Sequence, residues 1–474
     1  MICYCRRIYD ITKIPVRNNS VHAEKFMKKL FGTDGIRGAA GEFPLDEKTV
    51  RVIGESLARQ FAETLGRNPR FITGRDTRES GALIERAFHE GAGAAEADCE
   101  SAGVITTPGV AFLTKNLHFD AGVVISASHN PYRDNGIKIF LSDGKKINEE
   151  MEREIETDIF RLDIQDQISA ELDEIDFRAA DYQQSYINHL ADEFKTLDLN
   201  GYKIVMDCAN GAAYRLAPEL FRKFGAEIIV VNDTPNGKNI NENCGSLHLE
   251  NLQKKVLEAN ADFGVAFDGD ADRSLFVDEK GSLVDGDACL WIMANHLQAA
   301  GKLNNQTVVA TVMSNIGLEV ALASKNIKLV RAAVGDKYVL AEILKTGASI
   351  GGEQSGHIIF PLQSLVGDGM LTTLFLLEAV REKGKKLSEM TTGFAQFPQI
   401  LINVKVREKR PFDEVTEIKE AAREIEYQLG DKGRLLLRYS GTENLARVMI
   451  EGEKQSEIEI QANHLAEIIK KSLG

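Results

Sequence analysis

Two serines stand at the end of a short apolar run, where the sequence reads ISASHNPYRDNG. Ser126 and Ser128 follow Ile125, and a histidine, an asparagine and a proline come directly after them. Turn-forming residues at the end of a buried strand can hold a hydroxyl group in a fixed place, which suits a nucleophilic serine. Ordinary surface turns have the same composition, so these residues alone leave both interpretations open.

A second segment, DGDADR, places three carboxylates at alternate positions directly after the apolar run 263–267. Oxygen ligands of this kind favour Mg²⁺ or Ca²⁺. An EF-hand loop is excluded, because its sixth position requires glycine and Arg273 stands there. Asp268, Asp270 and Asp272 therefore predict a magnesium site with room for a phosphate oxygen, and Arg273 would help to hold that phosphate.

Two further loops combine hydroxyl, amide and basic groups. The sequence RYSGTEN offers the side chains and N–H groups of an anion-binding loop. The sequence GEQSGH can hydrogen-bond sugar hydroxyls and supplies an imidazole, although a hairpin with a solvated histidine would look the same. Basic residues recur in the loops of an acidic chain, which indicates an anionic ligand. These residues are Arg37, Arg75, Lys138, Arg273, Lys337, Arg438 and Arg447.

The composition excludes several classes of protein. The chain has 474 residues, of which 43% are hydrophobic, and a net charge of −14, which argues against a general nucleic-acid binder. Six scattered cysteines without metal-ligand spacing predict a reduced, cytoplasmic protein, and no apolar run approaches the ~18 residues of a membrane span. Residues 1–26 show no helical or strand period, so we expect an extension that is disordered or results from a wrongly assigned start before Met27.

Strand-like apolar runs alternate with amphipathic helical stretches, which predicts parallel sheets covered by helices on both faces. The tail after residue 398 has another order, strand–helix–strand–strand–helix, and predicts an α+β domain. No sequence repeat stands out. The expected strands include 70–73, 122–125, 203–206, 227–231, 263–267, 274–278 and 307–311, and the expected helices include 49–64, 81–95, 217–224, 249–259, 288–299, 412–429 and 456–473.

The motifs FGTDGIRG, GRDTR, ISASHNP, DGDADR, GEQSGH and RYSGTEN occur in this order, and from Met27 onward the chain resembles the α-D-phosphohexomutase superfamily. The resemblance implies an α/β protein in which three related α/β domains with mixed, mostly parallel sheets and a C-terminal α+β domain surround a central cleft. The expected domains are 27–168 with the phosphoserine loop, 183–283 with the metal loop, 284–394 with the sugar-recognition loop and 395–474 with the phosphate-binding loop.

The resemblance also implies roles for the residues of the first two motif loops. Ser128 would be the serine that is phosphorylated in the resting enzyme, while Ser126 would shape the loop. Asp268, Asp270 and Asp272 would bind one Mg²⁺ per chain, together with an oxygen of the Ser128 phosphate.

The remaining roles concern the substrate. Lys138 and His357 would be the candidate acid and base groups, with the choice between them open, and Arg37 would lie near the reacting phosphate. Tyr439 and Asn444 stand where many relatives have proline, which should loosen the phosphate-binding loop. The implied substrate-binding residues are Arg273, Glu353, Ser355, Arg438, Ser440, Gly441, Thr442 and Arg447.

Within the superfamily, GEQSGH with Gln354 and FGTDGIRG favour the members that interconvert glucosamine 6-phosphate and glucosamine 1-phosphate through glucosamine 1,6-bisphosphate, which supplies UDP-N-acetylglucosamine and cell-wall precursor synthesis. The alternative is a member that acts on mannose or glucose phosphates. A further alternative is a magnesium-dependent phosphatase, which net release of phosphate from glucosamine phosphates would favour. A non-catalytic sugar-phosphate sensor is disfavoured, because a sensor needs no phosphorylatable serine. We expect a small sugar phosphate as the only partner, with no nucleic acid or membrane, in a monomer or homodimer.

Overall fold

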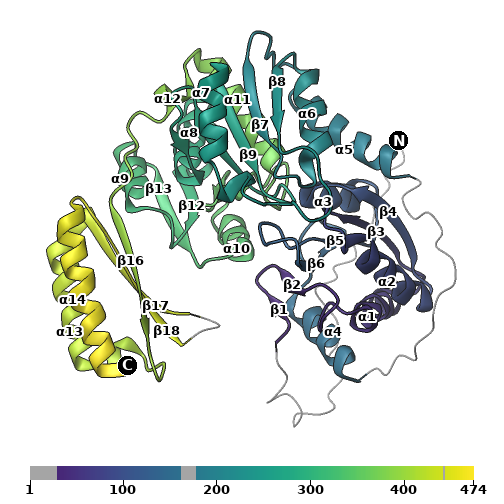
Figure 1. Ribbon diagram of the computed structural model, residues 1–474, viewed down its shortest axis with the longest axis horizontal. Coiled ribbons are helices and arrows are strands. Elements are labelled where there is room, and N and C mark those ends of the chain that lie inside the picture. The colour runs from purple at the N-terminus through teal and green to yellow at the C-terminus, as the bar shows by residue number, and fades with distance from the viewer. Residues whose placement is uncertain (1–28, 162–177, 441–443) are drawn as a thin grey trace, which may run out of the picture.

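The computed structural model describes residues 29–161, 178–440 and 444–474, so the extension at 1–26 lies outside the described part of the chain. Within these residues the strands form four sheets, three of them mixed and one antiparallel. Figure 1 shows three sheets following one another in an arc, while the C-terminal sheet stands apart on one side. This architecture confirms the predicted fold class.

Three of the sheets share one strand arrangement. Their orders contain β4-β3-β5-β6, β8-β7-β9-β10 and β13-β12-β14-β15; in each, the first three strands pair in parallel and the fourth runs antiparallel. β1 and β2 extend the first sheet, and β11 extends the second. The strands are β1 Phe31–Gly32, β2 Gly35–Ala39, β3 Arg70–Arg75, β4 Asp98–Val104, β5 Ala121–Ile125, β6 Asp134–Leu141, β7 Lys203–Asp207, β8 Glu227–Val231, β9 Phe263–Phe267, β10 Ser274–Asp278, β11 Leu283–Val284, β12 Thr307–Thr311, β13 Lys328–Ala332, β14 Gly351–Gly352 and β15 Ile358–Ile359.

The repeat is topological and places the motif loops at equivalent positions. The connection from the third to the fourth strand of the unit contains Ser128 in the first sheet, the DGDADR aspartates in the second and the GEQSGH residues in the third. Each connection starts at the carboxyl end of a parallel strand, which is where open α/β sheets bind their ligands. Each of the three domains thus contributes one of these motif loops to a shared region of the molecule.

Helices cover these sheets, and several of them begin with a side-chain cap. Asp46, Thr106, Asp285, Asn315 and Asp368 each accept a hydrogen bond from a backbone N–H in the first turn of a helix. The α-helices of the first three domains are α1 Glu47–Leu65, α2 Gly81–Ala94, α3 Thr107–Asn116, α4 Glu149–Arg161, α5 Ala179–Glu193, α6 Ala213–Lys223, α7 Glu250–Ala259, α8 Gly286–Ala299, α9 Ile316–Ser324, α10 Asp336–Thr346, α11 Gly369–Lys383 and α12 Leu387–Met390.

Two predicted helix starts differ from the structure by more than two residues. α6 begins four residues before the predicted start at residue 217 and contains Pro218, because the buried apolar face of the helix outweighs the unfavourable proline. In the tail, the predicted helix 412–429 divides into a short 3₁₀ turn, Phe412–Glu414, and α13, Thr416–Leu429.

The C-terminal domain has a hydrophobic core of its own. The antiparallel order β16-β18-β17 carries α13 and α14, and its buried cluster contains only residues of this domain, whereas one larger cluster runs through the first three domains. Such a separation permits the domain to move as a unit. Its other elements are β16 Gln399–Lys405, β17 Gly433–Tyr439, β18 Leu445–Gly452 and α14 Gln455–Leu473.

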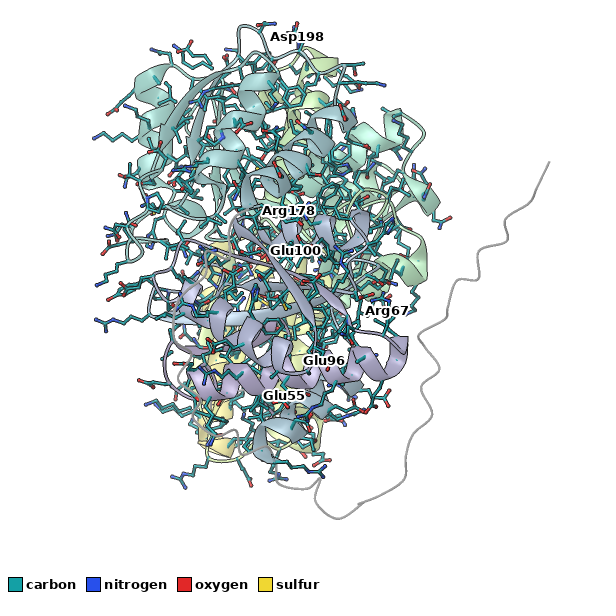
Figure 2. All side chains as sticks on the ribbon, turned by 90° about the vertical axis from the view of Figure 1, so that its right-hand side faces the viewer. Glu55, Arg67, Glu96, Glu100, Arg178 and Asp198 are labelled. Atoms are coloured by element: carbon teal, nitrogen blue, oxygen red, sulfur yellow. The ribbon has the colours of Figure 1, made fainter. Side chains whose placement is uncertain are left out.

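An ion pair on the outer face ties the first domain to the segment that leads into the second domain. Figure 2 shows Arg178 next to Glu100, and Arg178 Nη1 donates to Glu100 Oε2 at 2.7 Å. Arg178 precedes α5, and Glu100 lies on β4.

Within the described residues, no helix is long and apolar enough to cross a bilayer.

Candidate active site

Ser128 occupies the turn between β5 and β6 in a left-handed conformation with φ 54°. Its side chain is buried, and its Oγ donates a hydrogen bond to Asp268 Oδ2 at 2.6 Å. Ser126 Oγ accepts the Ser128 N–H at 2.9 Å and therefore supports the turn. Of the two serines, Ser128 is the one that faces the carboxylate cluster.

The three predicted metal ligands converge. Asp268, Asp270 and Asp272 are buried and offer oxygens that lie within 4.8 Å of one another. Oδ1 of Asp270 and Oδ1 of Asp272 have no hydrogen-bond partner among the described residues. Burial, followed by the charges of the other two aspartates, holds the pKa of Asp268 well above its ordinary value. Buried, unpartnered carboxylate oxygens in this arrangement fit a hard divalent cation such as Mg²⁺.

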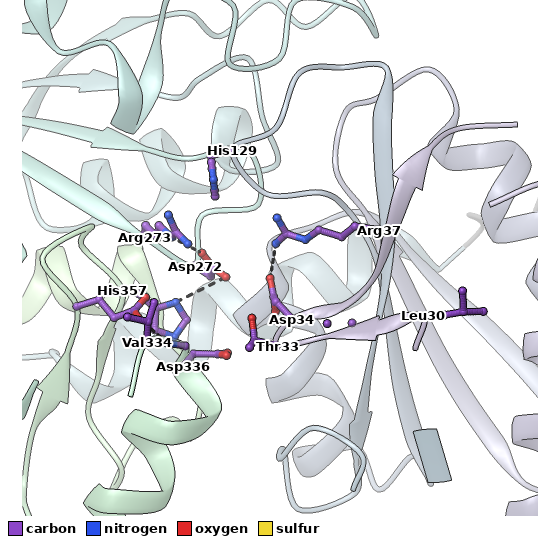
Figure 3. A pocket seen from close by; sticks show the side chains of 14 residues that line it. Leu30, Thr33, Asp34, Arg37, His129, Asp272, Arg273, Val334, Asp336 and His357 are labelled. Carbon is purple, nitrogen blue, oxygen red and sulfur yellow. Dashed lines mark hydrogen bonds and ion pairs between the residues drawn. The ribbon is translucent and has the colours of Figure 1, made fainter. Parts of the chain in front are cut away.

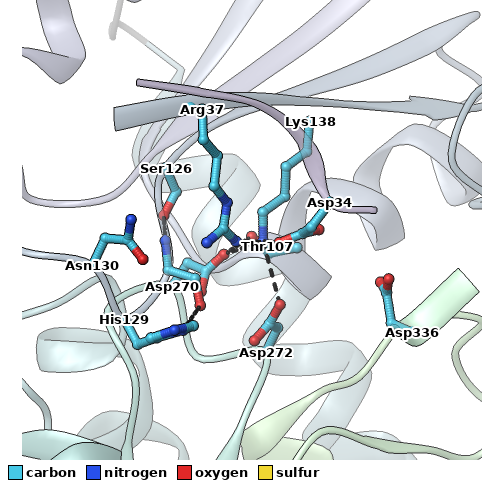
Figure 4. Close-up of polar contacts among 12 residues, drawn as sticks. Asp34, Arg37, Thr107, Ser126, His129, Asn130, Lys138, Asp270, Asp272 and Asp336 are labelled. Carbon is cyan, nitrogen blue, oxygen red and sulfur yellow. Dashed lines mark hydrogen bonds and ion pairs between the residues drawn. The ribbon is translucent and has the colours of Figure 1, made fainter. Parts of the chain in front are cut away.

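Lys138 on β6 lies beside Asp270 and Asp272 of this cluster, as Figure 4 shows. Its Nζ lies 2.8 Å from Asp270 Oδ2, 3.3 Å from Asp272 Oδ2 and 3.0 Å from Asp34 Oδ2. Burial opposes the charge of Lys138, but the three carboxylates outweigh it and hold the pKa well above its ordinary value. In this arrangement Lys138 is a cation that balances the charge of the three carboxylates.

His357 has contacts that act on its pKa in opposite directions. Burial lowers the pKa, but the contact with Asp272 raises it, to about 8. The Gly367 N–H, however, donates to Nε2 at 3.1 Å and requires that nitrogen to be unprotonated. The hydrogen bond therefore favours a neutral ring with its proton on Nδ1, directed at Asp272 Oδ2 3.7 Å away. To act as a base, His357 would have to lose the hydrogen bond that the Gly367 N–H donates to its Nε2.

Above these groups lies a cavity of about 410 Å³, shown in Figure 3. Arg37 from β2, His129 and Arg273 bring nitrogen groups to its wall. Burial lowers the pKa of His129 to about 4, with further lowering by Arg273 and Arg37. A wall with two arginines favours an anionic ligand. The cavity is lined by Leu30, Gly32, Thr33, Asp34, Gly35, Arg37, His129, Asp272, Arg273, Val334, Gly335, Asp336, Glu353 and His357.

The sugar-recognition loop contributes only part of its predicted residues to this wall. Glu353 lines the cavity, and its Oε1 accepts a hydrogen bond from the Gly335 N–H at 3.2 Å. Ser355 is half-buried in the same turn and does not line it. Gln354 donates to Asp285 Oδ2 at 3.2 Å, so it ties the loop to the start of α8. Gln354 thus affects the shape of the cavity indirectly, by fixing the position of the sugar-recognition loop.

An ion-pair bridge between the first and third domains was missed by the sequence analysis. Lys146 contacts Asp34 and lies 2.5 Å from Asp336 Oδ2 at the N-terminus of α10. Asp34 belongs to the FGTDGIRG motif, which could have drawn attention to it, but no local pattern singles out Lys146. Lys337, which the sequence analysis expected in a loop, lies in the first turn of α10 and points at Glu149, 3.7 Å away.

The predicted phosphate-binding loop lies on the C-terminal domain, away from the cavity wall. Arg438 and Arg447 stand directly opposite each other on β17 and β18, and burial with the charge of Arg447 lowers the pKa of Arg438. Like charges in this position are unfavourable unless an anion joins them. Ser440 is buried, while Gly441 and Thr442 lie outside the described residues. In Figure 1, β17 and β18 extend toward β1 and β2 of the first domain.

Tyr439, which replaces a proline of many relatives, is anchored at the end of β17. Its ring stacks on Phe412 with centroids 4.2 Å apart, and its hydroxyl donates to the carbonyl of Arg410. These contacts supply part of the rigidity that we expected the loop to lose.

Four family models match the chain in order. They are phosphoglucomutase/phosphomannomutase alpha/beta/alpha domain I over residues 28–166, domain II over 184–281, domain III over 285–397, and the C-terminal domain over 401–468. A phosphoglucosamine mutase of Solibacter usitatus is 47% identical over 451 residues, covering 94% of this chain and 99% of that protein. One of Syntrophotalea carbinolica is 46% identical over 450 residues, covering 94% and 98%.

Solved structures share the fold at lower sequence identity. A phosphoglucomutase/phosphomannomutase family protein from Burkholderia thailandensis has a TM-score of 0.76 at 21% identity, covering 95% of this chain and 99% of its own. The N-acetylphosphoglucosamine mutase of Aspergillus fumigatus, in complex with GlcNAc-6P and magnesium, has a TM-score of 0.65 at 18% identity, covering 94% and 96%.

Proposed function

The chain belongs to the phosphoglucomutase/phosphomannomutase superfamily, and from this premise we propose that it interconverts D-glucosamine 6-phosphate and α-D-glucosamine 1-phosphate, the reaction of a phosphoglucosamine mutase. Its relatives at 46–47% identity over 94% of the chain carry that name, which favours glucosamine phosphates over mannose or glucose phosphates. One observation carries the chemistry: the Ser128 hydroxyl is buried against Asp268 below an arginine-lined cavity.

In the proposed reaction, Ser128 carries a phosphoryl group that it donates to a hydroxyl of the sugar monophosphate. The product of this transfer is glucosamine 1,6-bisphosphate, whose other phosphate then returns to Ser128. Asp268, Asp270 and Asp272 would hold Mg²⁺, which when bound offsets the charge of the transferring group. Lys138 keeps two of these carboxylates in place beside that charge.

The residues of the cavity wall would bind the sugar phosphate during this exchange. Arg37 and Arg273 line the cavity and would contact the phosphate that is transferred, while Glu353 would contact sugar hydroxyls. Because the bisphosphate must present both ends to Ser128 in turn, the distal phosphate needs a site that accepts either end. The opposed pair Arg438 and Arg447 suits such a site, since guanidinium groups bind phosphate without reading the sugar.

The proton of the attacking hydroxyl needs an acceptor, and neither candidate base is free to accept it in this arrangement. Lys138 is held protonated, and the Nε2 lone pair of His357 is occupied by Gly367. We propose that His357 becomes the base only after substrate binding breaks the Gly367 bond, while Lys138 stays an electrostatic partner.

The test is interconversion of glucosamine 6-phosphate and glucosamine 1-phosphate by the purified protein, beside parallel assays with mannose and glucose phosphates. We expect turnover to be highest with the glucosamine phosphates and to be abolished in Ser128→Ala. Ser142→Ala, in an exposed loop of the same domain, is the matched control and should keep its activity. Preference for mannose or glucose phosphates, or near-normal turnover in Ser128→Ala, would overturn the proposal.

A further inference from the structure

The main chain of Ser128 is held in an unusual conformation by side chains to which the proposed reaction gives no role. A φ of 54° is uncommon for a residue with a side chain, and such a conformation persists only where the surroundings enforce it. Its N–H is already satisfied by Ser126 Oγ at 2.9 Å. The question is therefore what holds its carbonyl oxygen.

Two buried side chains from different domains donate to the same pair of carbonyls. Arg78, in the loop after β3, donates through Nη2 to Ser128 O at 3.2 Å and to Asn130 O at 2.6 Å. Asn241, in the loop between β8 and α7 of the second domain, donates through Nδ2 to Ser128 O at 2.9 Å and to Asn130 O at 3.2 Å. We refer to Arg78 and Asn241 as the carbonyl clamp. Arg78 is 3% and Asn241 9% exposed, so water competes little for these bonds.

Both members of the carbonyl clamp are themselves fixed. Arg78 is paired with Asp76, whose Oδ2 also accepts the Ser126 hydroxyl at 2.6 Å. One carboxylate therefore orients the groups that hold both the N–H and the carbonyl of Ser128. Asn241 is anchored by its own N–H, which donates to the Ala209 carbonyl at 2.9 Å.

The metal loop packs directly against the carbonyl clamp. A Cβ at Gly269, between two of the metal-ligand candidates, would lie 2.4 Å from Ser128 O and 3.0 Å from Asn241 Nδ2. The residue there must therefore be glycine, since only glycine lets the two loops approach this closely. The carbonyl clamp thus sets the separation between the Ser128 turn and the DGDADR loop.

We propose that Arg78 and Asn241 are positioning residues for phosphoryl transfer. By binding the main-chain carbonyls of residues 128 and 130, they aim the Ser128 side chain at Asp268 and leave its Oγ free to carry a phosphoryl group. The hydrogen bonds involve only main-chain acceptors, so they persist whether or not Ser128 is phosphorylated. The inference deepens the proposed function and rests on it, because it assumes transfer through Ser128.

The test measures phosphoryl transfer in a single turnover, because this rate constant does not depend on the fraction of active enzyme. Protein labelled with radioactive phosphate on Ser128 is mixed with excess sugar monophosphate, and loss of the label is followed by rapid quench. Asn241→Ala should slow this step by about 10- to 100-fold, the range expected for a small misplacement of a reacting group. The KM for the sugar monophosphate should change by less than about threefold, because Asn241 lies outside the cavity wall.

Asn241→Asp separates hydrogen bonding from packing. The carboxylate has the shape of the amide but directs an oxygen at two carbonyl oxygens, so this variant should be slower than Asn241→Ala, in which water can replace the donor. A packing role predicts the opposite order, since alanine removes more contacts. Asn239→Asp is the matched control: Asn239 is a partly exposed residue of the same loop, and among the described residues its side-chain amide donates to Thr234 O of its own domain.

The melting temperature of each variant is measured as a control for folding. If Asn241→Asp does not fold, the rate constants of Asn241→Ala and Arg78→Lys are compared with the wild type. If the folded variants of Arg78 and Asn241 have single-turnover rate constants within twofold of the wild type, the proposed positioning role of the carbonyl clamp is wrong. The proposed function fails separately if the wild type turns over mannose or glucose phosphate in place of glucosamine phosphate. The clamp variants are then compared on that sugar. A wild-type protein that never carries phosphate on Ser128 would overturn both.

Discussion

Replacing Lys138 by methionine removes the cation that the buried Asp270 and Asp272 share with the partly exposed Asp34. Its Nζ lies between 2.8 and 3.3 Å from Asp270, Asp34 and Asp272, and its side chain is 1% exposed. Removing one partner of a buried ion pair typically costs about 3–5 kcal/mol, because an uncompensated charge remains in a low-dielectric site. In a domain of this size the loss corresponds to a fall in melting temperature on the order of 10 °C.

Magnesium provides the second half of this prediction. A divalent cation on Asp268, Asp270 and Asp272 would supply the missing positive charge, so excess Mg²⁺ should raise the melting temperature of Lys138→Met more than that of the wild type. The assay is thermal unfolding followed by circular dichroism, once in EDTA and once in excess Mg²⁺.

Lys145→Met is the matched control, because Lys145 pairs with Asp143 at 2.7 Å on the surface, with both side chains more than 40% exposed. Such surface pairs contribute only about 0–1 kcal/mol. If the melting temperature of Lys138→Met in EDTA lies within about 2 °C of the wild type, the inference that Lys138 offsets the charge of the surrounding carboxylates is refuted.

Three further predictions concern stability and the position of the loops. Burial, reinforced by a neighbouring aspartate, raises the pKa of Asp287 to about 7; its protonated form favours folding, and this stability is lost as the pH rises toward and through 7. Asp287→Asn should therefore flatten the fall in melting temperature between pH 5 and 8, and an unchanged slope would contradict this assignment. Gly286→Ala would place a Cβ 2.0 Å from the carbonyl of Glu353, and the displaced sugar loop should lower kcat/KM by about tenfold or more in the mutase assay. Arg434 pairs with the buried Glu451 and donates to the Val312 carbonyl of the third domain at 2.8 Å. Arg434→Met should make the C-terminal domain unfold in an earlier, separate calorimetric transition, and a single unchanged transition would contradict it.

Much of the fold followed from local pattern. The apolar runs that became β5, β7, β9 and β12 were recognisable because strands buried on both faces need continuous apolar sequence. The threefold repeat of strand order was not recognisable, since equivalent strands need only be apolar and can differ in every residue. The start of α6 lies four residues before the predicted one, and the helix contains Pro218 in its interior, where proline is uncommon.

The amino-acid sequence by itself determined which residue types could do chemistry and in which loops they lie. Ser128 in a turn and three aspartates at alternate positions are local facts, and local spacing is enough to suggest a nucleophile and a hard cation. Only the tertiary structure decided how these groups act on one another. Lys138 is held charged by carboxylates from two domains, and His357 is hydrogen-bonded by a backbone N–H ten residues away. The carbonyls around Ser128 are bound by Arg78 and Asn241, which lie 50 and 113 residues from it. Protonation and orientation depend on distance and burial in space, and these exist only once the domains have packed together.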